Sequence, residues 1–305
     1  MQRNFEVIGI DHGFGATKTA NCMFKSGVVA SDNETYTSKD VLKYKGKYYI
    51  CGTGRQGLTK DKTEDENYFI LTLVAIAKEI EHRGLSRTLD VIVSAGLPLT
   101  SFGREKGNFK KYLSQLLPVK FEYENNEYKI TIKDVMLYPQ GYTAIACDQK
   151  LLGSEPSLAL IDIGSWTVDC MMINNSIPDA NGCRSLEYGI IRCIEQIQEE
   201  SRRTLGLQLT PAQIEQVLQR KPCSMDDKRK DLILSYGEKY TNELMKMLKE
   251  SGFDSLAIPT ILMGGGAMII NSFLKTGQDI RIIDDIHANA KGYESIANQV
   301  LDDGR

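Results

Sequence analysis

Histidine and tryptophan are scarce in this chain of 305 residues, which contains three histidines and one tryptophan. No histidine is spaced with a cysteine in the way that a structural zinc site requires, so we expect no such site. The seven cysteines are scattered, and none belongs to a C-x-x-C pair. Because an odd number of cysteines cannot all pair within one chain, a reducing, cytoplasmic location is the simplest expectation.

Long apolar runs and an excess of positive charge are missing as well. No stretch approaches the ~20 apolar residues that a membrane-spanning helix needs, and residues 1–4 lead into only a short apolar strand, unlike a secretory signal. The formal net charge is -3. Without an overall basic field to hold nucleic acid phosphates, any link to DNA is expected to pass through a partner.

Strands and helices are expected to alternate along the chain, which is typical of the α/β class. The length and the 42% of hydrophobic residues allow two domains, each with a buried core. The pattern predicts strands at residues 5–11, 18–24, 48–51, 89–94, 120–132 (a hairpin), 135–138, 158–163, 168–173 and 260–263. It predicts helices at residues 68–83, 105–117, 188–205, 211–220 and 231–250, with a loop at 222–231.

One device occurs twice, about 150 residues apart. Residues 8–19 (IGIDHGFGATKT) and 159–169 (ALIDIGSWTVD) each contain an apolar strand, an aspartate, a glycine turn and a return strand. This internal repeat predicts two similar lobes that face each other.

The repeated turns suit the binding of a polyphosphate, because a turn with small residues can present a row of backbone N–H groups to negative oxygens. Asp11 and Asp162 precede the turns and can hold magnesium, mainly through bound water. Lys18 lies on the return strand, where its ammonium can meet phosphate oxygens. The candidate loop residues are Gly13, Phe14 and Gly15 in the first copy and Gly164, Ser165, Trp166 and Thr167 in the second.

Each turn has an ordinary interpretation too. Asp-x-Gly turns are common in hairpins, and this is the favoured interpretation of either segment alone. A third glycine cluster reverses that preference. Gly264, Gly265, Gly266 and Ala267 follow an apolar strand and precede an expected helix, so this backbone could lie against an adenosine. The alternative is a flexible loop before a helix.

These motifs resemble those of the superfamily that contains actin, sugar kinases and heat-shock chaperone ATPases. Residues 11–18 resemble its first phosphate motif, 162–169 its second and 263–267 its adenosine motif, in that order. The resemblance implies a duplicated, ribonuclease H-like, two-lobed ATPase fold with a central nucleotide cleft. The expected lobes are residues 1–155, with a small subdomain at about 32–88, and 156–305, with a small subdomain at about 185–256.

Within that superfamily the chain is most similar to the ParM/StbA-type plasmid segregation proteins, through the stretches AGLPL (95–99), YPQGY (138–142) and NAKGY (289–293). The resemblance implies an ATP hydrolase that uses ATP or GTP with Mg²⁺ and polymerises with itself. Hydrolysis would then drive filament turnover. A DNA-binding adaptor of the ParR type would link the filament to plasmid DNA, with no membrane involved.

The same resemblance suggests further site residues. Gln140 matches the family's water-orienting position, whereas the slightly earlier glutamate of some ParM-type proteins falls near Met136, which cannot do this task. A polar residue at a helix start is the competing explanation for Gln140. Glu199 and Arg202 match a segment that contacts adenosine, although solvated charges explain them equally well. Trp166 could pack in the core or form a wall of the phosphate site.

Other functions of the same superfamily are a small-molecule kinase, a chaperone and a cell-shape protein. A kinase would need an aspartate base aimed at a substrate hydroxyl, and no sugar-binding or acyl-binding signature is present. A chaperone is expected to carry a further substrate-binding domain, and a cell-shape protein an amphipathic membrane-binding segment. We therefore expect the segregation filament.

Overall fold

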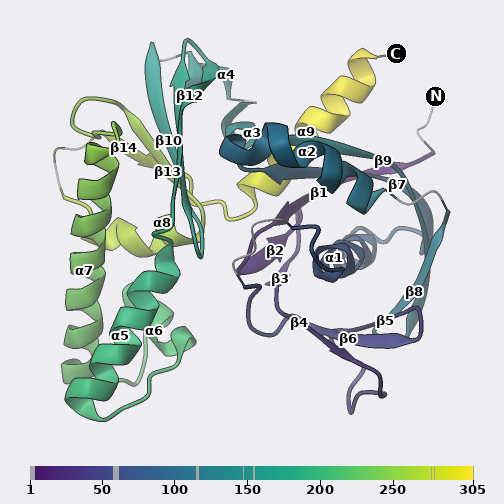
Figure 1. The fold of residues 1–305 in the computed structure, drawn as a ribbon, viewed down its shortest axis with the longest axis horizontal. Coiled ribbons are helices and arrows are strands. Elements are labelled where there is room, and N and C mark those ends of the chain that lie inside the picture. The colour runs from purple at the N-terminus through teal and green to yellow at the C-terminus, as the bar shows by residue number, and fades with distance from the viewer. Residues whose placement is uncertain are drawn as a thin grey trace. The chain divides into compact units, whose positions relative to one another are not determined.

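The computed structural model describes residues 4–57, 62–114, 117–146, 148–153, 155–275, 277 and 279–304. The chain divides into two compact units (Figure 1). Unit 1 consists of residues 1–149 and 287–305, and unit 2 of residues 150–286.

Unit 1 is built on one sheet, in which the strands follow the order β3-β2-β1-β7-β9-β8-β5-β6-β4. Its strands are β1 (Glu6–His12), β2 (Ala16–Lys18), β3 (Met23–Lys25), β4 (Val28–Ser31), β5 (Val41–Tyr44), β6 (Lys47–Cys51), β7 (Thr88–Leu97), β8 (Val119–Tyr123) and β9 (Asn126–Pro139). Its helices are α1 (Asn67–Arg83), α2 (Leu99–Leu113), α3 (Tyr142–Ala146) and α9 (Ala288–Asp303), and α4 (Gln149–Leu152) spans the junction with unit 2. Strands β1, β7 and β9 run parallel, so their carboxyl ends share one edge of the sheet.

Alternating side chains of the parallel strands place helices on both faces of this sheet. Ile8, Val91 and Val93 point to the core that contains α1 and α2, whereas Val7 and Ile92 pack with Ala297 of α9. The strands therefore read as continuous apolar runs, as expected for parallel strands covered on both faces.

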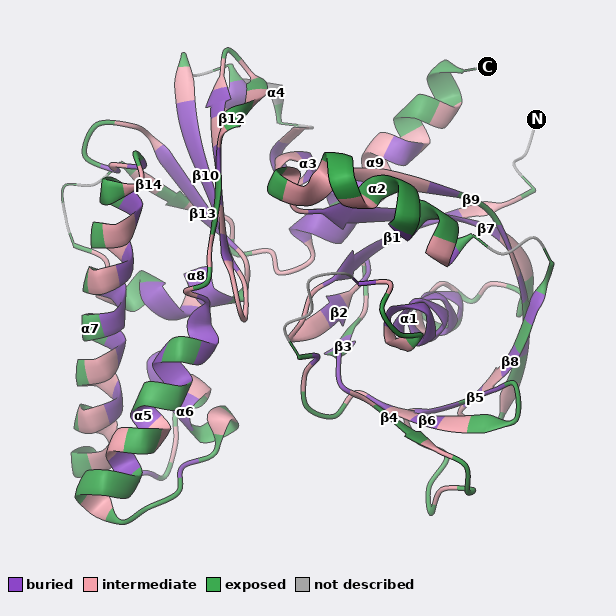
Figure 2. Cartoon of the chain, in the orientation of Figure 1, coloured by how far each residue is buried: buried purple, intermediate pink, exposed green. Residues whose placement is uncertain are grey.

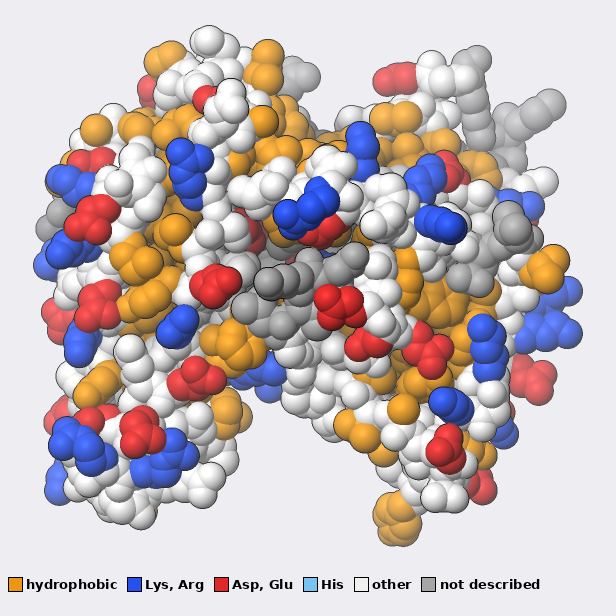
Figure 3. Space-filling view, in the orientation of Figure 1, with side chains coloured by type: hydrophobic (Ala, Val, Ile, Leu, Met, Phe, Trp, Pro, Cys, Tyr) orange, Lys and Arg blue, Asp and Glu red, His pale blue; other side chains and the backbone are white. Residues whose placement is uncertain are grey.

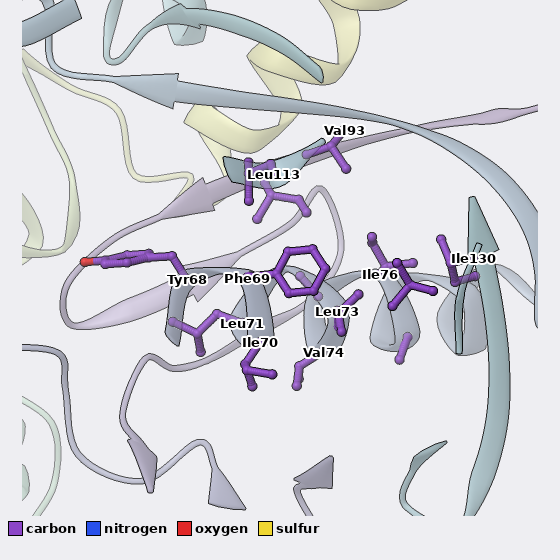
Figure 4. Close-up of a cluster of buried hydrophobic side chains, with 14 of the residues drawn as sticks. Tyr68, Phe69, Ile70, Leu71, Leu73, Val74, Ile76, Val93, Leu113 and Ile130 are labelled. Carbon is purple, nitrogen blue, oxygen red and sulfur yellow. The ribbon is translucent and has the colours of Figure 1, made fainter. Parts of the chain in front are cut away.

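Helix α1 forms the centre of the unit 1 core, and the sheet curves around it (Figure 1). Its side chains are buried without a break from Tyr68 to Ala77 (Figure 2), and of these Tyr68, Phe69 and Ile76 lie among side chains from the surrounding strands (Figure 4). A helix that is apolar all round requires such enclosure. It ends at Gly84, whose left-handed φ of 63° suits a glycine cap.

Unit 2 contains a smaller sheet with the order β12-β11-β10-β13-β14. Its strands are β10 (Ser157–Ile163), β11 (Val168–Asn174), β12 (Ile177–Leu186), β13 (Thr260–Met263) and β14 (Ile280–Ile282). Its helices are α5 (Ile190–Leu205), α6 (Pro211–Leu218), α7 (Asp227–Glu250), α8 (Gly265–Ile270) and the short 3-10 helix η1 (Asn271–Phe273). Ala159, Ile161 and Ile163 of β10 form one core with the apolar sides of α5 to α8, and the outer side of α7 is exposed (Figure 2).

Most expected elements are present, and the differences lie at element ends. The expected strand at residues 18–24 is wrong, because a turn closed by the bond from Thr19 N–H to Cys22 O separates β2 from β3. The helix expected from residue 105 begins at Leu99, directly after Pro98. The loop expected at 222–231 ends early, because Asp226 caps α7 by accepting a bond from the Arg229 N–H.

Helix α9 lies near the carboxyl end of the chain but belongs with the amino-terminal part. It belongs to unit 1, where it packs on β1 and β7. The expected lobes, residues 1–155 and 156–305, and their small subdomains at about 32–88 and 185–256 stay predictions.

Candidate functional site

The first repeated loop follows β1 at the carboxyl edge of the parallel strands. Three of its carbonyl oxygens accept hydrogen bonds from neighbouring segments of the chain. Gly13 O accepts a hydrogen bond from Ser26 Oγ (2.6 Å) and Gly15 O from the Ser26 N–H (3.2 Å). Phe14 O accepts from the Gln56 N–H (2.8 Å). Three successive carbonyls of the loop are therefore fixed by the protein itself.

This arrangement gives the loop a row of amide groups. In a trans peptide the C=O of one residue and the N–H of the next point in opposite directions. The N–H groups of Phe14, Gly15 and Ala16 thus point away from the segments that bind the carbonyls. Successive N–H groups with this orientation form a concave site for anions.

The second loop, after β10, has the same construction with different partners. Gly164 O, Ser165 O and Trp166 O accept hydrogen bonds at 2.9–3.1 Å from the N–H groups of Gly189 and the two residues that follow it at the start of α5. The N–H groups of Ser165, Trp166 and Thr167 consequently point to the opposite side. The repeat seen in the sequence is therefore a repeat of backbone geometry.

An aspartate is buried directly before each amide row. Asp11 is 4% exposed and Asp162 is 6% exposed. Lys18 Nζ lies 3.3 Å from Asp11 Oδ2 across the β1–β2 pair. In unit 2 the position equivalent to Lys18 is Asp169, which accepts a hydrogen bond from Thr167 Oγ1 (3.1 Å). The two loops thus share their backbone and aspartate but differ in the charge of the return strand.

The glycine cluster after β13 lies beside the second loop. Strands β10 and β13 are parallel, with Asp162 opposite Met263. At Gly264, where φ is +86°, an added Cβ would lie 2.3 Å from Asp162 Oδ1. Only glycine fits such a position, since both the conformation and the space exclude a side chain. Gly265, Gly266 and Ala267 continue into α8.

Gln140 lies at the same sheet edge as the first loop, between β9 and α3. Strand β7 separates β1 from β9, with Ile10 opposite Ala95 and Gly96 opposite Tyr138. The Gln140 N–H donates to Leu97 O at the end of β7 (2.8 Å). Ligand sites of α/β sheets form at this carboxyl edge, so unit 1 brings together Asp11, the first loop and Gln140.

The three short stretches that resemble ParM-type proteins also meet in unit 1. An added Cβ at Gly96 would lie 2.0 Å from Tyr293 Oη, and the Gly141 N–H donates to Asn289 Oδ1 (2.9 Å). The three stretches therefore pack against one another; they are residues 95–99, 138–142 and 289–293.

Glu199 and Arg202 lie on an exposed side of α5. Arg202 Nη2 and Glu199 Oε2 form an ion pair at 2.6 Å, with 53% and 69% of their side chains exposed. This geometry suits solvated charges as well as a ligand contact, so their adenosine role stays a prediction. Trp166 is half-buried within the second loop.

Some residues that shape the first loop lack a sequence signal. Lys62 Nζ donates to His12 O (2.8 Å), and Gln56 reaches Phe14 from a segment that carries no motif. The His12 ring is buried, with Nε2 2.8 Å from Thr72 Oγ1. Burial, assisted by the charge of Lys62, lowers the pKa of His12 to about 3. The ring is therefore a neutral part of the core.

Two family comparisons cover most of the chain. Residues 9–142 match the family described as the N-terminal domain of actin-like proteins. Residues 160–276 match the C-terminal family of the MreB-like archaeal actin homologue. The chain belongs to the actin-like ATPase superfamily. The expected two-lobed, actin-like α/β fold is thereby confirmed. A comparison with curated proteins gives no match to this actin-like chain.

Solved structures share the fold of this actin-like protein over nearly their full length. The archaeal actin homologue Ta0583 has a TM-score of 0.77 at 20% identity, covering 97% of this chain and 100% of that one; it was also solved in complex with ADP. The ParM of a 15-stranded filament from Clostridium botulinum has a TM-score of 0.74 at 19% identity, covering 97% and 100%. Bacillus thuringiensis ParM with AMPPNP has a TM-score of 0.72 at 15% identity, covering 98% and 100%.

Among the described residues, no group of three or more His, Cys, Asp or Glu side chains is arranged to hold a metal ion. Within the same ranges, no helix has the length and apolar character to cross a membrane.

Proposed function

We propose that this actin-like protein binds ATP with Mg²⁺, hydrolyses it, and assembles into filaments that separate plasmid DNA in the cytoplasm through an adaptor of the ParR type. The observation that carries the proposal is the matched pair of amide rows. Each unit presents three backbone N–H groups beside a buried aspartate at the end of a parallel strand. Rows of this kind are suited to binding the phosphate oxygens of ATP.

Buried carboxylates beside anion-binding rows support a bound cation. Each of Asp11 and Asp162 would repel a triphosphate bound at its own amide row unless a positive charge offset it. Magnesium would supply that charge, and the aspartates would hold it mainly through water. Lys18, already paired with Asp11, would add a point charge for the phosphates.

In this proposal Gln140 is the residue that orients the attacking water. It lies at the sheet edge that carries the first loop, and its backbone is fixed to β7. In-line attack on a terminal phosphate requires a residue that orients the water. The Gln140 amide can both donate and accept for that purpose. The backbone of Gly264 to Ala267 and the pair Glu199 and Arg202 would contact the adenosine.

Relatives support nucleotide binding and self-association. Structures with the same fold were solved with ADP, with AMPPNP and as filaments. Charged side chains of both signs are interspersed on the visible face (Figure 3), and the net charge is -3. A surface of this kind favours contact with DNA through an adaptor over direct binding.

Sedimentation of the purified protein tests the filament. With ATP and Mg²⁺ the pelleted fraction and the light scattering should rise, and both should fall for Asp162→Ala. Replacement of the exposed Asp227 by alanine serves as the control, since it removes a carboxylate far from either loop in the sequence. A protein that stays monomeric with every nucleotide contradicts the filament and favours a kinase or chaperone function.

A further inference from the structure

The backbone around Gln140 is held from two directions. On its amino side, the Gln140 N–H donates to Leu97 O of the neighbouring strand (2.8 Å). On its carboxyl side, the Gly141 N–H donates to Asn289 Oδ1 (2.9 Å). The second bond comes from α9, more than 140 positions later in the chain. Both peptides that flank the Gln140 side chain are thus oriented by fixed partners.

The hydrogen bond from the Gly141 N–H to Asn289 Oδ1 is buried. Asn289 is 5% exposed, and Gly141 is buried as well. Gly141 has φ +82°, a left-handed conformation in which the chain turns from β9 into α3. Loss of the acceptor would leave a buried N–H without a partner, which costs about 1–3 kcal/mol and favours rearrangement of the turn.

Asn289 itself is positioned by close packing of α9. An added Cβ at Gly292 would lie 2.3 Å from Thr143 O, so α9 and α3 are in direct backbone contact. On the other side, the Gly9 N–H donates to Glu294 Oε2 (3.0 Å). The helix is therefore fixed against both β1 and the segment that follows Gln140.

We propose that Asn289 is a positioning residue for ATP hydrolysis, which sets the orientation of Gln140 through the Gly141 peptide. This inference rests on the proposed function, in which Gln140 orients the attacking water. We expect Asn289 to act on the turnover step, because its bond is to the backbone of the turn that carries Gln140. A small displacement of a catalytic group lowers the rate strongly, since reaction requires close alignment.

The test compares ATP turnover with ATP affinity in the full chain. Asn289→Ala should lower kcat about tenfold or more and leave the Kd for Mg-ATP within about twofold of the wild type. Asn289→Asp should restore most of the rate, because it keeps an acceptor oxygen and a negative charge is favourable in the first turn of a helix. If Asn289→Ala does not fold, Asn289→Ser replaces it, since its hydroxyl is one bond too short to reach Gly141.

A matched control separates positioning from general loosening of α9. Ser94 Oγ donates to Tyr293 O (2.8 Å), another buried bond between α9 and the sheet, and Ser94 lies opposite Met136 of β9. Ser94→Ala should therefore leave kcat near the wild-type value. An equal loss of kcat in Ser94→Ala and Asn289→Ala would overturn the proposal.

A double-mutant cycle shows whether Asn289 acts through Gln140. In the Gln140→Ala background, Asn289→Ala should cause no further loss of kcat, because the residue it positions is already absent. Additive losses would overturn the proposal. If Gln140→Ala is slow while folded Asn289→Ala turns over ATP like the wild type, the inference fails alone. If the wild type does not hydrolyse ATP, the proposed function fails and the inference with it.

Discussion

The two loops have no side chain in common, yet their amides are arranged alike. The amides belong to Phe14, Gly15 and Ala16 in the first loop and to Ser165, Trp166 and Thr167 in the second. The partners of the carbonyls differ as well, being Ser26 and Gln56 in one loop and the start of α5 in the other. What the two loops share is a backbone function, which depends on peptide geometry and little on side-chain identity. This explains why even a tryptophan is compatible with the second loop.

The neighbouring residue His12 should make stability depend on pH. Its pKa is about 3 in the folded protein against 6.5 for an unperturbed histidine, so the unfolded chain binds more protons between these values. Stability should be unaffected above about pH 6.5 and should fall as the pH decreases toward 3. Between about pH 7 and pH 5 the loss from His12 is about 2 kcal/mol.

Urea unfolding at several pH values measures this effect. The decline between about pH 7 and pH 5 should be smaller for His12→Gln than for the wild type, whereas His82→Gln, a change at an exposed position, should follow the wild type. Identical pH profiles for the wild type and His12→Gln would show that His12 is not a buried neutral ring.

The sequence identified the residues whose role depends on local spacing. Asp11, Asp162 and the loop glycines were recognisable because strand, aspartate and turn are contiguous in the chain. Gly264 was placed by its cluster, and the structure adds its contact with Asp162. Lys62, Gln56 and Asn289 reach the site from distant segments through single hydrogen bonds, for which no spacing rule exists.

At the scale of elements, a buried ionic network connects α1, α9 and the β2–β3 turn. Glu79 of α1 is fully buried and accepts hydrogen bonds from Thr19 and from the Asn21 N–H (2.9 Å). Arg83 contacts Glu79 (2.5 Å) and Glu294 of α9 (2.7 Å). Burial would raise the pKa of Glu79, but the hydrogen bonds from Thr19 and Asn21, together with Arg83, lower it below its usual value.

Removal of Arg83 should therefore destabilise the protein strongly. In Arg83→Ala the buried Glu79 carboxylate loses its cation, and the expected loss in the free energy of unfolding is ~3–5 kcal/mol. Arg87→Ala is the matched control, because its ion pair with Glu81 is exposed and should contribute little. Urea unfolding of both variants measures the difference, and equal stabilities would contradict a structural role of the network.

Elements with strong local patterns were predictable and those defined by tertiary contacts were not. Helix α1 and strand β10 are apolar runs with clear ends, and the start of α6 carries a capping box between Thr210 and Gln213. Strand β12 was missed, since Pro178, Asn181 and Gly182 are typical of turns and the strand forms by pairing with β11. Helix α9 was not predicted either, and its small residues and glycine serve close contact with β1 and α3.

At the scale of the whole molecule, both units follow the same plan. In each, parallel strands end at one edge, an aspartate is buried there, and an amide row follows. The duplication in the sequence is thus a duplication of the buried aspartate and the amide row.

A titration with Mg-ATP, followed by the fluorescence of Trp166, tests this central claim most directly, because the only tryptophan reports from the loop of unit 2. The fluorescence should change and saturate with rising Mg-ATP. The Mg-ATP concentration at the midpoint should rise about tenfold in Lys18→Met, a substitution in unit 1, which corresponds to a loss of about 1.4 kcal/mol in binding free energy. Lys25→Met, the same loss of charge at an exposed position of β3, should leave the midpoint unchanged. No fluorescence change, or a midpoint that Lys18→Met does not affect, would contradict the proposal that bound Mg-ATP uses both loops.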